Sequence, residues 1–295
     1  MIDPNKYGVS FSIKQCKALQ VDPAKNLEWL ISQMGFRRFR LMSYWDEIEQ
    51  EQGLFDFNHL DNQFRTIRDV GGYITLCVGV RQPRWPESHW PSWTHNLPNA
   101  AKYQALEQFI KYVIERYKGQ KYLLNYQLEN EALNRSFGNR GDFNRNRIQK
   151  EYSLIKQLDP SRSIIMSTSN SWGIPVFQPK PDIVGFSVYT IRFDKDRYTH
   201  SIWPAWFYQM RAKAIKKPCF IHELQAEPWG HKPTQDMSIP DQNRAMPIQR
   251  LEKNIKLAKE IGLYPIDLWG GEWWYRRWEK FNDSSPMTTI IENIT

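Results

Sequence analysis

The fold is decided by a pattern first seen in residues 7–35, YGVSFSIKQCKALQVDPAKNLEWLISQMG. Its start, Tyr7 to Ser12, is typical of a short buried strand. Asp22 and Pro23 then supply an N-cap and a first-turn proline for a helix, and Gly35 is a suitable stop after it. The apolar residues at helical spacing between them are Leu27, Leu30, Ile31 and Met34. The segment therefore predicts one strand followed by one helix.

The same strand–helix unit recurs along the chain. Strands are predicted at 7–12, 38–42, 73–79, 123–128, 163–167, 183–187, 219–222 and 266–269. Helices follow at 22–35, 58–70, 100–117, 142–158, 205–215, 246–261 and 287–294. Alternating strands and helices of this kind predict a parallel sheet covered by helices. We expect an α/β fold, a closed (β/α)8 TIM barrel, as a single domain over residues 1–295.

An open doubly wound sheet is the alternative fold. A dinucleotide-binding sheet carries a glycine fingerprint in its first strand-to-helix turn. That turn here is SFSIKQCKA, residues 10–18, which contains no glycine. The barrel is therefore favoured.

Length and composition exclude several classes of protein. The chain has 295 residues, of which 41% are hydrophobic and 24% charged, values that exclude disordered and fibrous proteins. No stretch reaches the 18 or more apolar residues of a membrane-spanning helix. The start, MIDPNKYGVSFS, has no apolar run typical of a signal peptide. We expect a monomer that is cytoplasmic, or secreted if a leader has been removed, with no membrane contact.

Cysteine, histidine and charge give no sign of a cofactor or a nucleic acid. Of three cysteines, Cys77 and Cys219 lie in apolar runs and are expected to be buried thiols. No CxxC or HExxH spacing occurs, so neither a metal nor another cofactor is expected. The net charge of +8 is spread along the chain in pairs, with one looser cluster from Arg135 to Lys150. Such spacing is typical of a solvated surface, so nucleic-acid binding is not expected.

The aromatic content is high: 13 Trp, 14 Tyr and 15 Phe make up 14% of the chain. A core rarely needs that many indoles, so some should line a surface on which flat ligands such as sugars stack. Trp85 and Trp229 follow the third and seventh strands and are the candidate platforms. Three more follow the eighth strand, where they could stack on sugar or simply pack: Trp273, Trp274 and Trp278.

In a parallel barrel, the working groups lie at the carboxyl ends of the strands. The strand-end residues here are Arg40, Glu129, Asn130, Glu131, Tyr189, His222, Glu223 and Trp269. Carboxylates after two different strands indicate glycoside hydrolysis, in which one protonates the leaving oxygen and the other acts at the anomeric carbon. A separation of about 5 Å between the two would indicate a retaining enzyme.

The motifs around these glutamates resemble those of the retaining glycoside hydrolases of clan A. LNYQLENEAL, residues 124–133, is similar to the clan's strand-four motif, which implies that Glu131 is the acid/base and that Asn130 binds the substrate 2-hydroxyl. PCFIHELQAEPW, residues 218–229, resembles the strand-seven motif, which implies that Glu223 is the nucleophile. Departures at Glu129 and His222 leave the family within the clan, and the sugar, open.

Three further positions match the clan. Arg40, in FRRFRLMSYWDEIEQEQGLFDF, resembles the strand-two arginine that holds the nucleophile. Tyr189 resembles the strand-six tyrosine that hydrogen-bonds the nucleophile. Trp269, in IDLWGGEWW, resembles the strand-eight tryptophan under the reacting sugar. The resemblance spans nearly the whole chain and extends to cellulase-like and β-galactosidase-like enzymes.

The sequence thus predicts a retaining β-glycosidase that degrades a β-linked oligo- or polysaccharide. The tryptophan-rich loops favour action within a chain, and action at a chain end is the alternative. A non-catalytic carbohydrate-binding barrel is the alternative from another class. Two residues compete for the catalytic roles: Glu129, which two-residue alternation places on the face of Glu131, and Glu227, four residues after Glu223.

Overall fold

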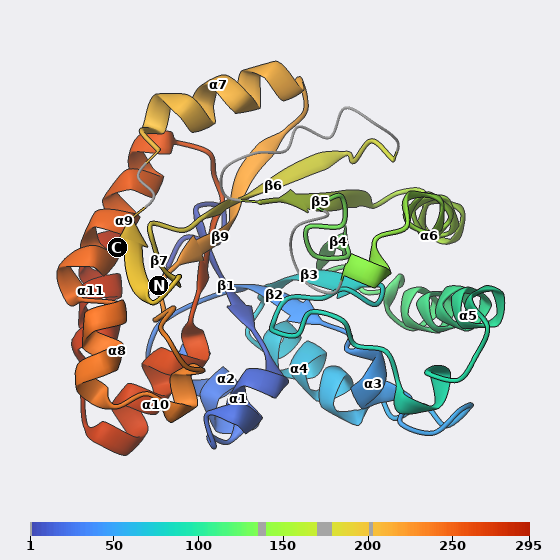
Figure 1. Ribbon diagram of the computed structural model, residues 1–295, viewed down its shortest axis with the longest axis horizontal. Coiled ribbons are helices and arrows are strands. Elements are labelled where there is room, and N and C mark those ends of the chain that lie inside the picture. The colour runs from blue at the N-terminus through green and yellow to red at the C-terminus, as the bar shows by residue number, and fades with distance from the viewer. Residues whose placement is uncertain (1, 135–139, 170–178, 201–202) are drawn as a thin grey trace. The chain divides into compact units, whose positions relative to one another are not determined.

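A computed structural model describes residues 2–134, 140–169, 179–200 and 203–295. Its strands form a closed barrel in the order β1-β10-β9-β6-β5-β4-β3-β2, shown in Figure 1. The predicted (β/α)8 barrel is confirmed, and the open doubly wound sheet is excluded. The first residues of the looser basic cluster, 135–139, lie outside the described part of the chain.

The strands are β1 Tyr7–Phe11, β2 Arg38–Met42, β3 Tyr73–Val78, β4 Leu123–Leu128, β5 Ser163–Thr168, β6 Ile183–Val188, β7 Ile191–Asp194, β8 Arg197–His200, β9 Cys219–Gln225 and β10 Ile266–Trp269. The helices are α1 Ile13–Ala18, α2 Pro23–Ser32, α3 Trp45–Ile48, α4 Asn58–Asp69, α5 Asn99–Tyr117, α6 Arg145–Leu158, α7 Ala205–Ile215, α8 Ile239–Ala245, α9 Ile248–Ile261, α10 Gly271–Phe281 and α11 Ser285–Ile294. Short 3-10 turns lie at Ser92–Thr94, Arg140–Asp142 and Thr234–Asp236.

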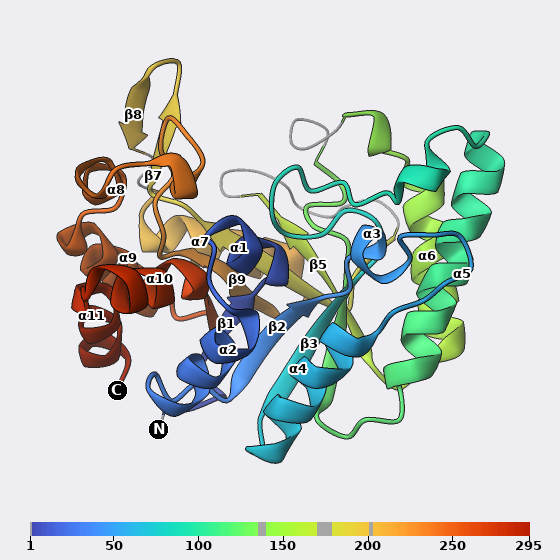
Figure 2. The ribbon, with the colours of Figure 1, turned by 90° about the horizontal axis from the view of Figure 1, so that it is seen from below.

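The chain divides into two compact units, residues 40–184 and residues 1–39 with 185–295. In the first unit, β3 pairs in parallel with β4, and β4 with β5. Helices α5 and α6 lie side by side in both ribbon views (Figures 1 and 2). The expectation of one domain over residues 1–295 stays a prediction.

In the second unit, β10 pairs in parallel with β1 on one side and β9 on the other. Helix α2 begins as predicted, because Asp22 accepts hydrogen bonds from the N–H groups of Ala24 and Lys25 and Pro23 occupies the first turn. Helix α9 ends at Gly262, whose φ of +71° suits a glycine. These caps fix where the helices stop and the strands resume.

Several elements differ from those predicted. Strands β7 and β8 form a hairpin that the sequence did not reveal, and Figure 2 shows it beside α8. Residues 271–281 form helix α10 where a loop was expected. The predicted helix 246–261 begins only after Pro247, and a separate helix, α8, precedes it.

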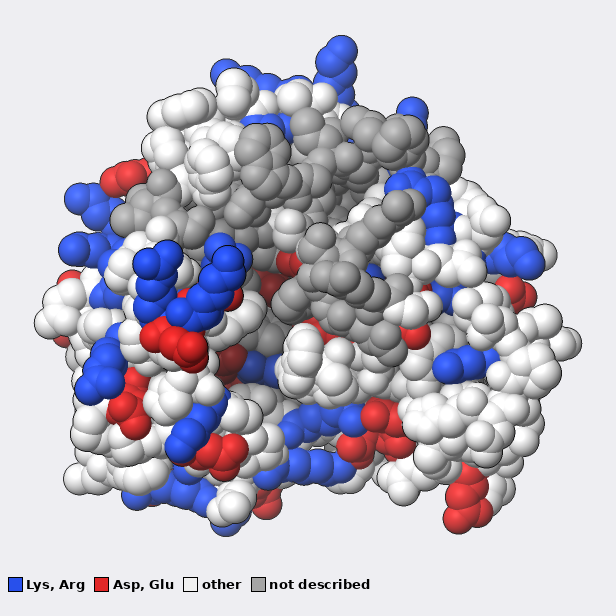
Figure 3. Space-filling view, in the orientation of Figure 1, with Lys and Arg blue, Asp and Glu red and all other residues white. Residues whose placement is uncertain are grey.

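The composition-based expectations have mixed outcomes. Cys77 is buried, as expected, whereas Cys219 is half-buried, and both are free thiols. Among the described helices, none is long and apolar enough to cross a membrane. On the face drawn in Figure 3, described Lys and Arg side chains are interspersed with Asp and Glu. That the chain binds no nucleic acid stays a prediction.

Candidate active site

The chain turns sharply where β4 ends, at Glu129, Asn130 and Glu131. The backbone φ is +47° at Glu129 and +43° at Glu131. Residues with a Cβ disfavour this left-handed region, and such strain gathers at functional sites. The three residues are nevertheless buried, with exposures of 0%, 2% and 8%. Two backbone hydrogen bonds to the end of β3 and the loop after it, from Glu129 N–H to the Val78 carbonyl and from Asn130 N–H to the Arg81 carbonyl, hold the turn together with side-chain contacts.

Glu131, the predicted acid/base, is fixed at both its backbone and its carboxyl group. Its N–H donates to Ser167 Oγ on β5 at 2.8 Å. Asn134 Nδ2 donates to Glu131 Oε2 at 2.8 Å, and the N–H of Asn134 donates to the Glu131 carbonyl at 2.8 Å. A neutral amide thus orients this carboxyl group.

Asn130 is held at both ends of its amide. Its Oδ1 accepts from Arg40 Nη2 at 3.2 Å, Ser167 Oγ at 3.1 Å and Gln127 Nε2 at 3.4 Å. Its Nδ2 donates to the two carboxylate oxygens of Glu87 at 3.0 and 3.1 Å. The structure therefore brings Asn130 and Arg40 together, while the predicted contact of Asn130 with a sugar hydroxyl stays a prediction.

Arg40 is buried on β2, with 1% exposure. Besides Asn130, it contacts Gln127, whose Oε1 accepts from Arg40 Nε at 2.7 Å. Its predicted role, holding Glu223, stays a prediction.

Sequence reasoning missed Glu87. This residue lies in the loop after β3, is only 6% exposed, and has a φ of +65°. The sequence feature that could have identified Glu87 is its place in a strand-to-helix loop, where barrel enzymes carry functional groups. Trp85, two residues earlier, is 75% exposed. Its role as a platform for sugar stays a prediction.

The carboxylate of Glu129, the alternative acid, binds an arginine and two backbone amides. Its carboxylate accepts from the N–H groups of Val80 and Arg81 and forms a bidentate ion pair with Arg147 at 2.5 and 3.1 Å. The alternation that placed it on the face of Glu131 fails because the backbone is left-handed at both residues. Both oxygens of this carboxylate are therefore taken up by the ion pair, and one of them also by the two amides.

Glu223, the predicted nucleophile, lies inside β9 and is 6% exposed. Its Oε2 accepts from Tyr189 Oη at 3.3 Å and lies 3.5 Å from Ser187 Oγ. The structure thus brings Tyr189 to Glu223, as the resemblance implied. Hydroxyl donors of this kind stabilise an ionised carboxylate.

Two predicted aromatic residues lie on the same unit as Glu223. Trp229 is 37% exposed, and its ring meets Tyr189 edge-on, with centroids 5.4 Å apart and planes at 90°. Trp269 ends β10 and is 7% exposed. Its carbonyl accepts from the N–H of Ala226 at 3.0 Å. Trp229 therefore offers an accessible ring, whereas Trp269 is mostly covered.

The two other candidates near β9, His222 and Glu227, are buried and contact neighbouring residues. His222 is 1% exposed and its Nδ1 lies 2.7 Å from Asp267 Oδ2, so it is a buried histidine in contact with a carboxylate. Glu227, the rival nucleophile, is 7% exposed and packs against Gly270, where an added Cβ would come within 2.8 Å of Glu227 Cβ.

The other tryptophans mostly pack. Trp273 and Trp274 are 1% and 0% exposed within α10, which settles the two readings in favour of packing, and Trp278 is 40% exposed. Trp90 and Trp93 contact Trp45 at centroid distances of 5.5 and 5.8 Å.

Within the described residues, no group of three or more His, Cys, Asp or Glu side chains is placed to hold a metal ion.

Comparisons with known proteins also indicate a glycoside hydrolase. The family model described as "Cellulase (glycosyl hydrolase family 5)" matches residues 3–247. Among curated protein sequences, none matches this chain.

Solved structures share the fold at low identity. A β-galactosidase from Rahnella sp. R3 is 10% identical with a TM-score of 0.59, over 91% of this chain and 50% of its own. A protein named GH5_18 from Streptomyces cattleya, solved with GlcNAc, is 10% identical with a TM-score of 0.62, over 91% and 71%. An endo-β-1,4-xylanase from Gloeophyllum trabeum is 15% identical with a TM-score of 0.57, over 91% and 84%. The chain spans only half the length of the β-galactosidase.

Proposed function

Because this chain belongs to the cellulase family, glycosyl hydrolase family 5, and is therefore a glycosidase acting on carbohydrate, we propose that it cleaves β-glycosidic bonds with retention of configuration. In this proposal Glu131 is the acid/base and Glu223 the nucleophile. Membership of a hydrolase family sets aside the non-catalytic binding barrel. No cofactor enters the proposed reaction.

The observation that carries the proposal is the different surrounding of the two glutamates. Glu223 accepts from the hydroxyl of Tyr189 and lies near that of Ser187, and in this proposal it acts as the charged nucleophile. Glu131 accepts from the neutral amide of Asn134, and in this proposal it is the residue that gives and takes back the proton. A charged group and a proton carrier are the two parts that double displacement needs.

The proposed reaction has two steps. Glu131 protonates the glycosidic oxygen while a carboxylate oxygen of Glu223 bonds to the anomeric carbon and the glycosidic bond breaks. Glu131, now ionised, takes a proton from water, which attacks the anomeric carbon and releases Glu223. The carboxyl ends of strands in a parallel barrel share one rim, which is why we expect both residues to act on one bond.

The substrate is proposed to be a β-linked chain cut internally. The exposed rings of Trp85 and Trp229 support this, because stacking faces bind sugars beyond the two that flank the scissile bond. Cleavage at a chain end is the alternative, and the products distinguish the two: a ladder of oligosaccharides for internal cleavage and a single sugar for terminal cleavage.

The test is an assay of wild type, Glu131→Ala and Glu223→Ala on aryl β-glycosides and on β-glucan, mannan and xylan oligosaccharides. We expect both variants to lose activity and azide to restore Glu131→Ala on activated aryl substrates. NMR of the first product formed by the wild type should show the β-anomer. Undiminished turnover by Glu223→Ala, or an α-anomer as first product, would refute the mechanism.

A further inference from the structure

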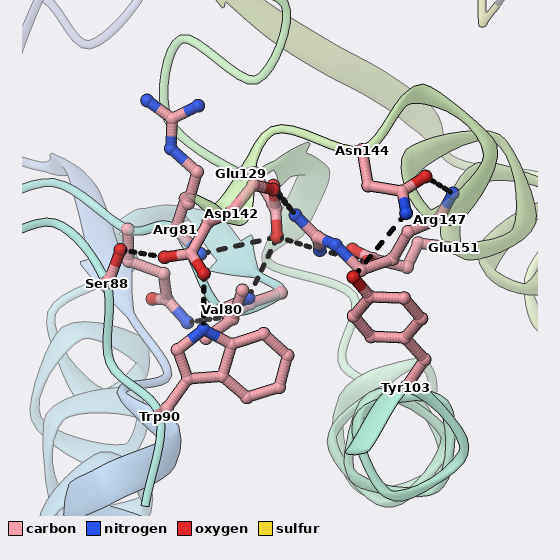
Figure 4. A network of polar contacts seen from close by, with 12 residues as sticks. Val80, Arg81, Ser88, Trp90, Tyr103, Glu129, Asp142, Asn144, Arg147 and Glu151 are labelled. Carbon is pink, nitrogen blue, oxygen red and sulfur yellow. Dashed lines mark hydrogen bonds and ion pairs between the residues drawn. The ribbon is translucent and has the colours of Figure 1, made fainter. Parts of the chain in front are cut away.

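Next to the turn that carries Glu131 lies a buried ionic cluster of Glu129, Arg147 and Glu151 (Figure 4). The exposures of these residues are 0%, 3% and 0%. Charged side chains are almost never buried to this degree unless they are paired. Neither Arg147 nor Glu151 belongs to the motifs that assign the family, so the cluster calls for its own explanation.

Glu129 joins two strand ends. Its Oε1 accepts from the N–H groups of Val80 and Arg81, which follow β3, at 3.1 and 3.3 Å. Its own N–H donates to the Val78 carbonyl at 3.0 Å. The residue that begins the left-handed turn after β4 is therefore bonded to the end of the neighbouring strand.

Arg147 clamps Glu129 from helix α6. Its Nη1 and Nη2 donate to the two oxygens of Glu129, Nη1 also pairs with Glu151 Oε1, and Nη2 donates to the Asp142 carbonyl at 2.9 Å. The guanidinium lies 6.0 Å from the ring centre of Tyr103 on α5. One cation thus connects the turn after β4 with α5, α6 and the segment before α6.

The contacts continue around a closed path. The Asp142 carboxylate accepts from Ser88 Oγ and from Trp90 Nε1, the latter at 2.9 Å. Ser88 follows Glu87, whose carboxylate binds Asn130. Asn130 lies between Glu129 and Glu131. The contacts therefore form a ring. It runs from Glu129 to Arg147 and Asp142, then to the loop after β3, and ends at Asn130, the neighbour of Glu129.

The cluster has two carboxylates and one guanidinium. Arg147 faces two carboxylates, and among the described residues Glu151 Oε2 has no hydrogen-bond partner. Burial raises the pKa of Glu151, Arg147 opposes this, and the charges of Glu129 and Glu107 add to the increase. Glu129 accepts from two amide N–H groups and from both terminal nitrogens of Arg147, whereas Glu151, in the part of the chain that the structure describes, is contacted through Oε1 alone.

Gly79 shows how closely this cluster is packed. An added Cβ there would come within 2.6 Å of Glu129 Cγ and 3.1 Å of Glu151 Oε2, and the backbone φ is +96°. A residue without a side chain is required at this point.

We propose that Glu129 is a positioning residue for the acid/base Glu131: held by Arg147 and by the amides after β3, it fixes the left-handed turn from which Glu131 projects. This inference rests on the proposed function, because it gives Glu129 a task only if Glu131 transfers a proton. Glu129 touches neither the substrate nor the transferred proton in this account.

The test is Glu129→Gln, which keeps the shape and removes the charge that binds Arg147. The measured quantity is kcat/KM, which reports bond cleavage up to release of the first product, on glycosides with good and poor leaving groups. A dinitrophenolate departs without a proton, whereas an alkyl or sugar alcohol needs one. We expect a loss of about 100-fold for the poor leaving group and of no more than about threefold for dinitrophenolate.

The control is Asp61→Asn, which removes another ion pair of the same unit, between Asp61 and Arg116 on the surface of α4 and α5. We expect it to leave both substrates within about twofold of wild type. Equal losses for the two leaving groups in Glu129→Gln would overturn the positioning role and indicate general destabilisation.

A second measurement does not depend on activity. Hydrogen exchange of the Val80 and Arg81 amides, which donate to Glu129, should accelerate about tenfold or more in Glu129→Gln but not in Asp61→Asn. Unchanged exchange in peptides covering 79–82 and 129–134 would overturn the inference. If wild type cleaves no glycoside, the proposed function fails, and exchange still decides whether Glu129 holds the turn.

Discussion

The two strand ends that carry the candidate glutamates are built differently. At the end of β9, Glu223 lies within the strand, whose pairing with β10 shifts register between Ile221 and Leu224 and then continues to Gln225, and hydroxyl groups contact its carboxylate. At the end of β4 the ladder has stopped, and Glu131 follows a turn with two left-handed residues. Strand pairing with β10 continues past Glu223, whereas the turn before Glu131 depends on the side-chain contacts of Glu129 and Asn130 as well as on backbone hydrogen bonds. Substitutions far from the chemistry should therefore harm the β4 end more than the β9 end.

The largest effect on stability is expected for Arg147→Met. Removing the cation leaves the buried Glu129 without its partner, and breaking such a pair costs about 3–5 kcal/mol of the free energy of unfolding. Urea denaturation measures this loss. Arg116→Met is the control, because its partner Asp61 lies near the surface and the loss should be about 1 kcal/mol or less. Equal losses in the two variants would contradict the difference between buried and exposed pairs.

Gly79→Ala should have the next largest effect. The added methyl group meets Glu129 and Glu151, and the positive φ adds strain, so we expect a loss of about 2–4 kcal/mol. Gly71→Ala separates the two causes, since Gly71 has a φ of +66° but open space around its Cα, and should cost about 1 kcal/mol. Thermal and urea unfolding of both variants test this. A loss at Gly79 no greater than that at Gly71 would show that the cluster is loosely packed.

Tyr189→Phe tests the β9 end. The variant loses the hydroxyl that contacts Glu223 Oε2 at 3.3 Å, and we expect kcat to fall about tenfold. Because the strand holds the nucleophile, the free energy of unfolding should change by no more than about 1 kcal/mol. Ser187→Ala, which removes the longer 3.5 Å contact, should lower kcat less. A kcat in Tyr189→Phe equal to that of wild type would contradict a contribution of the Tyr189 hydroxyl to the reaction.

Near pH 4, Glu151→Gln is expected to change the free energy of unfolding least of these variants. Burial raises the pKa of Glu151 above its ordinary value of 4.5, so above pH 4.5 the folded protein keeps a proton that the unfolded chain releases. The stability that this proton supplies is full below pH 4.5 and is lost as pH rises toward the raised pKa. Glutamine needs no proton, so the variant should match wild type near pH 4 and exceed it increasingly at higher pH. Parallel stability–pH curves for the two proteins would refute the proton on Glu151.

Much of the barrel could be predicted from the sequence, because short apolar runs and capped helices are local signals. The strand at 123–128 has the predicted bounds, and Asp22 caps α2 as expected. The β7–β8 hairpin was missed because its turn uses Lys195 and Asp196 in the left-handed region instead of a glycine. Helix α10 was missed because Gly270 and Gly271 precede a run of tryptophans that resembles a binding loop.

The candidate site could be predicted only in part. The motifs at Glu131 and Glu223 lie next to strand ends and are visible in the sequence. The contacts of Glu129 are not, because its partner Arg147 is 18 residues away and the pairing depends on how α6 packs. Glu87 was missed for a similar reason: a single carboxylate in a loop gains meaning only when its contact with Asn130 is seen.

The most direct test of the account is to trap the covalent intermediate. Wild-type protein is incubated with an activated 2-deoxy-2-fluoro glycoside of the sugar that it cleaves, and the labelled peptide is identified by mass spectrometry. The account predicts one glycosyl group per chain, attached to Glu223, and none in Glu223→Ala. A label on Glu227 or Glu129, or a first product with inverted configuration, would contradict it.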